Sequence, residues 1–245
     1  MTSYHGGKQK IGKEIASVIV EEALYIAKDS DFKINGYCEP FCGMLGVYRH
    51  VPKLFKDEGL ELTYKAGDMN KSVIMMWNES QKGWTPPSSV NEERFLQLKL
   101  GDDCAEKGFV CHQYSFRGQW CKPFVKNYGK ISDFPRAVKN VKDIGKELEE
   151  VEFSFGDYNQ YSNLKNYVIY CDPPYNNYSQ YYGCKFNSDK FYNWCREMSK
   201  NNIVFVSEYS VPDDFTEIWG KSTKVSGNKI KNHIKRTEKL FLIKN

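Results

Sequence analysis

The sequence predicts an α/β protein built on a mostly parallel, doubly wound sheet with helices on both faces and a small inserted subdomain that is mainly helical and irregular. Short apolar runs alternate with amphipathic stretches over most of the 245 residues, which is typical of strands alternating with helices. The alternation stops after residue 84 and resumes at residue 151. We therefore expect one main domain, formed by residues 1–84 and 151–245, and an insertion at residues 85–150.

The first part of the chain repeats a strand, turn and helix order. Apolar residues recur with a helical period over residues 11–27, a short strand is expected at 34–39, and a helix at 43–51, with Pro52 at or near its end. A second strand is expected at 61–66 and a second helix at 71–78. Strand, glycine turn and helix form the opening unit of a doubly wound sheet.

The insertion and the last part of the chain differ from each other. Helices are expected at 89–99 and 134–150, with an irregular, aromatic and basic stretch at 101–133 between them. Strands then return at 151–155, 167–171 and 202–207, and a hairpin-like pair is expected near 221–225 and 239–243.

Composition excludes several classes of protein. No apolar run of about 18 residues occurs, and the first residues lack the apolar centre of a signal peptide, so we expect an intracellular, soluble protein. The eight cysteines form no CxxC pair and suit reduced, packed thiols, so neither a zinc site nor a disulfide framework is expected. None of the four histidines has metal-ligand spacing, so no metal is expected.

The net charge of +4 is modest, but basic residues cluster in two regions. Residues 117–146 and the tail from residue 221 each carry eight lysines and arginines, and the first region interleaves them with aromatic residues. This pattern suits a phosphate backbone and exposed bases. Each cluster taken singly is equally well interpreted as a solvated surface.

The tetrapeptide Asp172-Pro173-Pro174-Tyr175 directly follows the apolar run at 167–171. Prolines have no N–H to donate and fix φ, so the chain leaves the sheet stiffly. A carboxylate held there can accept hydrogen bonds from an exocyclic amine, while a ring beside it can stack on the base that bears the amine. The alternative is a simple turn between two elements.

Acidic residues also follow the other expected strands. Glu39 precedes a glycine turn at Gly43, and no glycine-rich phosphate-binding motif is present, which indicates a cationic or amino-bearing ligand. Asp68 stands where an acid binds ribose hydroxyls, with a helix N-cap as an equal alternative. Asp157 is either a turn residue or a contact to the amine of a cofactor's adenine.

Five motifs together resemble the Dam-type, D12-class DNA adenine-N6 methyltransferases over most of the chain. The resemblance implies a Rossmann-like S-adenosylmethionine-dependent methyltransferase sheet. In chain order the motifs are Tyr4-His5-Gly6-Gly7-Lys8, Glu39-Pro40-Phe41-Cys42-Gly43, Asp68, Asp157-Tyr158 and Asp172-Pro173-Pro174-Tyr175.

The resemblance also implies a role for each motif. The first lines the S-adenosylmethionine pocket, the second lies near the methionine part, Asp68 binds the ribose and Asp157-Tyr158 the adenine. The implied catalytic residues are Asp172, Pro173, Pro174 and Tyr175, which receive the N6 amine of an adenine flipped out of double-stranded DNA. The implied cofactor-binding residues are Tyr4, Gly7, Lys8, Glu39, Pro40, Phe41, Gly43, Asp68, Asp157, Tyr158 and Asp172.

The insertion resembles family members in which a Ser-Phe-x-Gly-x-Trp stretch precedes a basic helix. DNA contacts are therefore expected from Arg117, Trp120, Lys122, Lys126 and Lys130, in a monomer or weak dimer. The Asn-Gly-x-x-Arg pattern of the enteric relatives is absent from the sequence, so their target sequence is not carried over. Methylation of RNA adenine, of cytosine N4 or of a protein glutamine amide, and a catalytically silent DNA-binding module, remain alternatives; an Asp at 172 rather than Asn favours DNA adenine.

Overall fold

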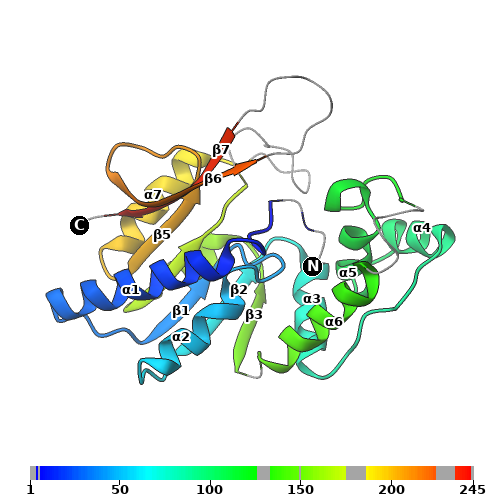
Figure 1. The fold of residues 1–245 in the computed structure, drawn as a ribbon, viewed down its shortest axis with the longest axis horizontal. Helices are drawn as coiled ribbons and strands as arrows, with labels where there is room; N and C mark the ends of the chain where they lie inside the picture. The colour runs from blue at the N-terminus through cyan, green and yellow to red at the C-terminus, as the bar shows by residue number, and fades with distance from the viewer. Residues whose placement is uncertain are drawn as a thin grey trace.

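The computed structural model describes residues 4, 6–125, 133–148, 150–174, 186–224 and 235–243. Its centre is a seven-stranded sheet in the order β3-β2-β1-β4-β5-β7-β6 (Figure 1). Strands β1 to β5 run parallel, and β7 is antiparallel to both β5 and β6. The strands are β1 (Gly36–Glu39), β2 (Thr63–Asp68), β3 (Val151–Phe155), β4 (Tyr167–Cys171), β5 (Ile203–Glu208), β6 (Phe215–Lys224) and β7 (Lys235–Ile243).

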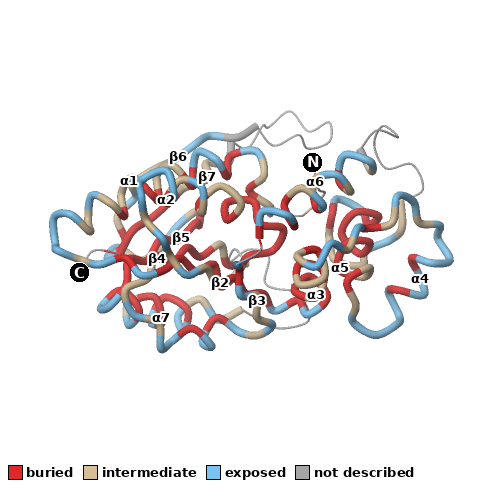
Figure 2. The backbone as a smooth tube through the Cα atoms, turned by 90° about the horizontal axis from the view of Figure 1, so that it is seen from below, coloured by how far each residue is buried: buried red, intermediate tan, exposed pale blue. Residues whose placement is uncertain are grey.

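Helices cover both faces of this sheet. Figures 1 and 2 show α1 (Gly12–Ser30) and α2 (Val51–Asp57) on one side of the strands and α7 (Ser188–Ser199) on the other. At one end, next to α3 (Lys71–Gln81), lie α4 (Glu92–Leu100), α5 (Ala105–Gln113) and α6 (Asp133–Lys146). The predicted α/β fold class, with helices on both faces of the sheet, is confirmed.

The central strands are buried along their length, as Figure 2 shows. Every residue of β1 and β5 is buried, and so is β4 after its first residue. This follows from the sequence, because parallel strands covered on both faces need apolar side chains at nearly every position. Strand β1 pairs with β2 on one side and with β4 on the other, so the strand order reverses between β1 and β4. Ligand crevices of open α/β sheets form at such a point, outside the carboxyl ends of the strands.

The expectation of a helix at 43–51 is wrong. The chain makes a turn with left-handed residues at Gly43 (φ +44°) and Leu45 (φ 54°), then a short 3-10 helix at Tyr48–His50, and α2 starts only at Val51. Pro52 therefore lies in the first turn of α2 and does not end a helix. Proline is tolerated there because its missing N–H would have no partner within the helix.

Helix α5 lies where an irregular stretch was expected, and α7 was not predicted. Seven of the nine residues of α5 are buried, including two polar ones at its end, so the segment has no polar face to reveal a helical period. Gly108 allows it to pack on α3, because a Cβ at this position would lie 2.2 Å from the Ser72 carbonyl oxygen. Close packing rather than propensity thus determines this helix.

The expectation that all cysteines are reduced is wrong for one pair. Cys111, at the end of α5, forms a disulfide with Cys121. The Cys121 N–H also donates to the Cys111 carbonyl at 3.0 Å, so the chain closes a loop that contains the 3-10 turn Phe116–Gly118. The other described cysteines are free: Cys38, Cys42, Cys104, Cys171 and Cys195. Over the described ranges, no helix has the length and apolar character needed to span a membrane.

Candidate active site

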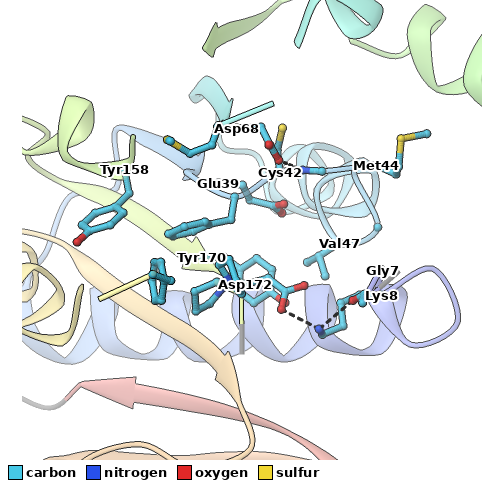
Figure 3. Close-up of a pocket in the computed structure, with 18 of the residues that line it drawn as sticks. Gly7, Lys8, Glu39, Cys42, Met44, Val47, Asp68, Tyr158, Tyr170 and Asp172 are labelled. Atoms are coloured by element: carbon cyan, nitrogen blue, oxygen red, sulfur yellow. Dashed lines mark hydrogen bonds and ion pairs between the residues drawn. The ribbon is translucent and has the colours of Figure 1, made fainter. Parts of the chain in front are cut away.

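A cavity of about 470 Å³ lies at the carboxyl ends of β1, β2 and β4, where the strand order reverses. Its wall is formed largely by the residues that end these strands or directly follow them, and by the segment Gly6–Gln9 before α1. Figure 3 shows Glu39, Asp68 and Asp172 grouped around the same space, with Lys8 beside Asp172. The volume is within the range of small-molecule and cofactor sites, roughly 300–1,000 Å³.

The last residue of β1, Glu39, places an almost fully buried carboxyl group at this cavity. The Tyr37 hydroxyl donates a hydrogen bond to Glu39 Oε1 at 2.6 Å. Burial raises the pKa of Glu39 well above its usual range; the Tyr37 hydrogen bond opposes this shift, and the charge of Asp172 adds to it. A cation bound beside Glu39 would offset the cost of ionising it.

Gly43 closes the turn after β1 in a way that few other residues could. Its φ is +44°, and a Cβ there would lie 2.9 Å from the ring of Tyr4. The Trp77 indole N–H donates to the Gly43 carbonyl at 2.8 Å, which ties the turn to α3. The glycine thus lets the backbone approach both the cavity and the N-terminal segment.

Asp68, at the end of β2, is held by two backbone N–H groups. Gly43 N–H donates to Oδ2 at 3.0 Å and Asn70 N–H to Oδ1 at 2.8 Å. Burial raises the pKa of Asp68 to about 6, although both hydrogen bonds oppose the shift. The N-cap alternative is wrong, because the N-cap of α3 is Asn70, which accepts a bond from Val73 N–H. The Asp68 carboxyl group instead lines the cavity.

Asp157 and Tyr158 follow β3 and line the cavity together. Asp157 Oδ1 accepts from the Asn159 N–H at 3.0 Å, so it caps the short 3-10 helix Tyr158–Tyr161 and also faces the cavity. The Tyr158 ring packs against Phe41, with ring centroids 5.7 Å apart. The two rings give this side of the cavity an aromatic wall.

Asp172 leaves the end of β4 and forms an ion pair with Lys8. The Lys8 ammonium donates to Asp172 Oδ1 at 2.7 Å and to the Gly6 carbonyl at 3.3 Å, and only 5% of the lysine side chain is exposed. Two stiff residues, Pro173 and Pro174, follow and also line the cavity. The pair orients one carboxylate oxygen of Asp172 through a charge-assisted hydrogen bond.

Tyr209, directly after β5, and Glu238 on β7 complete this side of the cavity. Lys8 Nζ lies 3.6 Å from Glu238 Oε2, and the Tyr209 hydroxyl donates to Glu238 Oε1 at 3.3 Å. Behind them, burial raises the pKa of Glu208 to about 7; the Tyr209 N–H bond opposes the shift and the Asp172 charge adds to it.

The structure brings together nearly all the cofactor and catalytic residues expected from the sequence. Pro40 is buried but does not line the cavity, and Tyr175 lies outside the described residues. The expected residues found on the wall are Tyr4, Gly7, Lys8, Glu39, Phe41, Gly43, Asp68, Asp157, Tyr158, Asp172, Pro173 and Pro174.

Several cavity residues were not predicted, among them Tyr170, Lys190, Tyr209 and Glu238. Tyr209 lies two residues after the expected strand at 202–207, which was the available signal. Lys190 could not be found because α7, which carries it, was not predicted. Glu238 reaches the cavity only through the antiparallel pairing of β7 with β5.

The described residues among those predicted to bind DNA are Arg117, Trp120 and Lys122, and they do not line the cavity. Arg117 is exposed, in a left-handed conformation (φ 56°), and its guanidinium carbon lies 5.2 Å from the centre of the Phe116 ring, which is itself 50% exposed. Lys122 is exposed, whereas Trp120 is half-buried with its ring 5.0 Å from that of His112. Lys126 and Lys130 lie outside the described residues.

The side chains on the cavity wall fit S-adenosylmethionine. Its sulfonium and amino groups are positively charged, and its ribose hydroxyls and adenine amine are hydrogen-bond donors, so carboxylates and flat aromatic faces are suitable partners. The described wall offers Glu39, Asp68, Asp157, Asp172 and Glu238 as acids and the rings of Phe41 and Tyr158. Within the described ranges, no group of three or more His, Cys, Asp or Glu side chains could hold a metal ion.

The chain is similar to methyltransferases in two comparisons. Residues 116–238 match the model of a family described as D12 class N6 adenine-specific DNA methyltransferase. Among solved structures, two of the rRNA methyltransferase aviRa from Streptomyces viridochromogenes are 11% identical, with 94% of this chain and 84% of that chain covered and a TM-score of 0.39. A putative RNA methyltransferase from Pyrococcus horikoshii is 9% identical, with 92% and 83% covered and a TM-score of 0.39. No curated protein sequence matches.

The family match and the site coincide in one part of the chain. The matched half contains the end of β4 with Asp172 and Pro173, and it reaches Glu238 on β7. The family implies S-adenosylmethionine as the methyl donor. The chain belongs to the D12 class of N6 adenine-specific DNA methyltransferases.

Proposed function

We propose that this protein transfers a methyl group from S-adenosylmethionine to the exocyclic N6 amine of an adenine in double-stranded DNA, at a specific short sequence. The observation that carries the proposal is the position of Asp172 in the segment Asp172-Pro173-Pro174 after β4, which we call the corner. Lys8, at 2.7 Å, orients the Asp172 carboxylate on the wall of a cavity of cofactor size. The family match supports adenine as the methylated base.

The substrate amine is held by groups at the end of β4. Lys8 binds Asp172 Oδ1, and Oδ2 is the oxygen to which an amine N–H would donate. The Pro173 carbonyl is the second acceptor for the same amine. Two such bonds draw the nitrogen lone pair out of conjugation with the ring, which makes the nitrogen a better nucleophile. The fixed corner reduces the freedom that the reacting atoms must lose.

The cofactor is held by the first three strand ends. S-adenosylmethionine, when bound, supplies a methyl group on a positively charged sulfur. In this proposal Asp68 accepts from the ribose hydroxyls, Asp157 accepts from the adenine amine, and Phe41 and Tyr158 pack on the adenine ring. Glu39 and the turn at Gly43 face the methionine part. These assignments agree with the placement of each side chain on the cavity wall.

A base inside a duplex cannot reach this corner, because its amine is stacked and paired. The target adenine would therefore be flipped into the cavity, where Tyr175 would stack on it. Residues 85–150 would form the target-recognition part. In support, Phe116 and Arg117 stand exposed in that part, and α6 exposes Arg136, Lys139, Lys142 and Lys146 to solvent, as a phosphate-binding surface requires.

The proposal is tested by transfer of a radiolabelled methyl group to four substrates, followed by digestion to nucleosides. The substrates are a mixed-sequence DNA duplex, the same duplex with every adenine already N6-methylated, the matching single strand and an RNA duplex. We expect label only in the unmodified DNA duplex, as N6-methyladenine.

Each other outcome identifies a different error. Label in N4-methylcytosine or in RNA would show that the proposed substrate is wrong, while the proposed methyl transfer would stand. Duplex binding without label on any substrate, with cofactor present, would favour a catalytically silent DNA-binding module.

A further inference from the structure

We propose that Glu238 is a positioning residue of the methyl-transfer site, which keeps the corner around Asp172 net negative by offsetting the charge of Lys8. The inference rests on the proposed function. It adds to the site a residue on β7, a strand that is distant in sequence from Asp172. This residue was not expected in the site from the sequence.

The sheet topology brings Glu238 to this corner. Strand β7 pairs antiparallel with β5, with Lys239 opposite Glu208, so the first half of β7 lies beside the carboxyl end of β5. The carboxyl end of β4, from which Asp172 emerges, is the next one along the sheet. Glu238 therefore faces the cavity although its strand runs in the opposite direction, and only 17% of its side chain is exposed.

The described contacts of the Glu238 carboxylate include one with Tyr209 and one with Lys8. The Tyr209 hydroxyl donates to Oε1 at 3.3 Å, and Lys8 Nζ lies 3.6 Å from Oε2. The same ammonium group is 2.7 Å from Asp172 Oδ1. Lys8 is thus shared between two carboxylates, with the shorter contact to Asp172.

The charges of these three side chains do not cancel. Taken by themselves, one ammonium group and two carboxylates carry one net negative charge, in a part of the protein where screening by water is weak. Without Glu238, the Lys8–Asp172 pair would be neutral. Lys8 would still orient Asp172, but these side chains would attract positive charge less strongly.

Positive charge is what this reaction brings to the corner. S-adenosylmethionine, when bound, would carry it on sulfur, and the amine nitrogen held by Asp172 would gain it as the new N–C bond forms and the S–C bond breaks. The nitrogen would then lose one proton, through the Asp172 carboxylate, to water. Fixed negative charge placed where positive charge develops lowers the barrier without reorganisation. The neutral thioether product, in contrast, gains nothing from that charge, so the corner favours the donor over the product.

The affinity ratio of donor to product measures this effect without any turnover. S-adenosylmethionine and S-adenosylhomocysteine differ only in the methyl group and its charge, so calorimetry on the full chain gives the ratio directly. We expect Glu238→Gln, which keeps the shape and removes the charge, to lower the ratio about fivefold. Glu238→Asp, which keeps the charge, should stay within about twofold of the parent.

The matched control is Glu217→Gln on the neighbouring strand β6. Glu217 also pairs with a lysine, Lys239, at 2.7 Å, but it does not line the cavity. This change should leave the ratio unaltered. In steady-state methylation, Glu238→Gln should lower kcat about tenfold while the KM for DNA stays within about twofold, because the residue acts on charge in the transition state.

The outcomes separate this inference from the proposed function. An unchanged ratio in Glu238→Gln, in a parent that binds both compounds, would overturn the role of Glu238 and leave the proposed function standing. A parent that binds neither compound would overturn both. Equal losses in the Gln and Asp variants would show that shape rather than charge matters, and would also overturn the inference.

Discussion

The cavity at the carboxyl ends of the strands is lined by carboxyl groups, several of them buried. The inserted segment differs, because it has exposed basic side chains and a histidine buried among aromatic rings. Glu39 and Asp68 are almost fully buried and accept short hydrogen bonds from the chain itself. In the insertion, Arg117 and Lys122 are exposed, while the ring of His112 lies 4.5 Å from Tyr4 and 5.0 Å from Trp120.

The contrast matches two kinds of ligand. A small cationic ligand needs few acceptors at fixed positions, and a parallel sheet provides rigid strand ends for them. A nucleic acid presents a long, regular line of negative charge, which exposed basic side chains can bind in water. If this division is correct, changes in the cavity affect transfer and cofactor binding, and changes in the insertion affect nucleic-acid binding or stability alone.

The largest effect is expected at Asp172. Asp172→Ala removes the acceptor for the amine, so methyl transfer to DNA should fall about a thousandfold or more. The circular dichroism spectrum should stay that of the parent, and Asp213→Ala, which changes an exposed acid after β5, should keep full activity. Transfer within tenfold of the parent would contradict the role of the corner.

Asp68 tests the cofactor half of the cavity. Asp68→Ala should weaken S-adenosylhomocysteine binding about a hundredfold in calorimetry. The change removes the carboxylate that accepts hydrogen bonds from two backbone N–H groups and, in the proposal, from the ligand. In the parent, the pKa of Asp68 is raised to about 6 by burial, so affinity should decrease as the pH falls through about 6 and the carboxylate is protonated. Asp57→Ala, at the exposed end of α2, serves as the control. An Asp68→Ala variant with parental affinity would remove the residue from the site.

His112 tests what holds the insertion together. Burial lowers its pKa from 6.5 to about 4, although its bond to the Gly118 carbonyl opposes the shift. The unfolded chain therefore binds the proton more readily between these values, so stability is full above pH 6.5 and is lost as the pH falls. The parent should lose about 2 kcal/mol of unfolding free energy from this group between pH 7.5 and 5.0.

The measurement is urea unfolding at both pH values for the parent and for His112→Asn. The asparagine can still donate to Gly118 but does not titrate, so its pH dependence should be smaller by that amount. His50→Gln is the comparison: burial also lowers the pKa of this half-buried histidine, so its removal should reduce the pH dependence in the same direction but by less. Equal pH dependence in the parent and His112→Asn would show that the ring titrates freely in the folded protein.

The smallest effect is expected at the exposed basic residues. Arg117→Ala should weaken DNA binding about tenfold and leave cofactor affinity unchanged. Lys122→Ala should weaken binding less and reduce the slope of log affinity against log salt by about one. Lys33→Ala, exposed between α1 and β1 at the other end of the sheet, should change neither quantity. A loss of cofactor affinity in Arg117→Ala would break the division between the two regions.

Much of the site could be predicted from the sequence because it is built from strand ends. Asp68 and Asp172 each stand at or directly after an apolar run, and parallel strands bring such positions together whatever their separation in the chain. The same logic failed at the turn after β1, where left-handed residues delay the helix to Val51.

The sequence by itself determined the alternation of strands and helices, the acids at the strand ends and the stiff corner after β4, because these depend on local pattern and on the geometry of proline. The tertiary structure alone decided three other features: helix α5, the Cys111–Cys121 disulfide and the place of Glu238 beside Lys8. Each depends on contacts between segments, which no local periodicity records. A buried helix has no polar face, and a disulfide needs two particular Cα positions to come close together. The position of an antiparallel strand relative to the site can be predicted only when its partner strand is known.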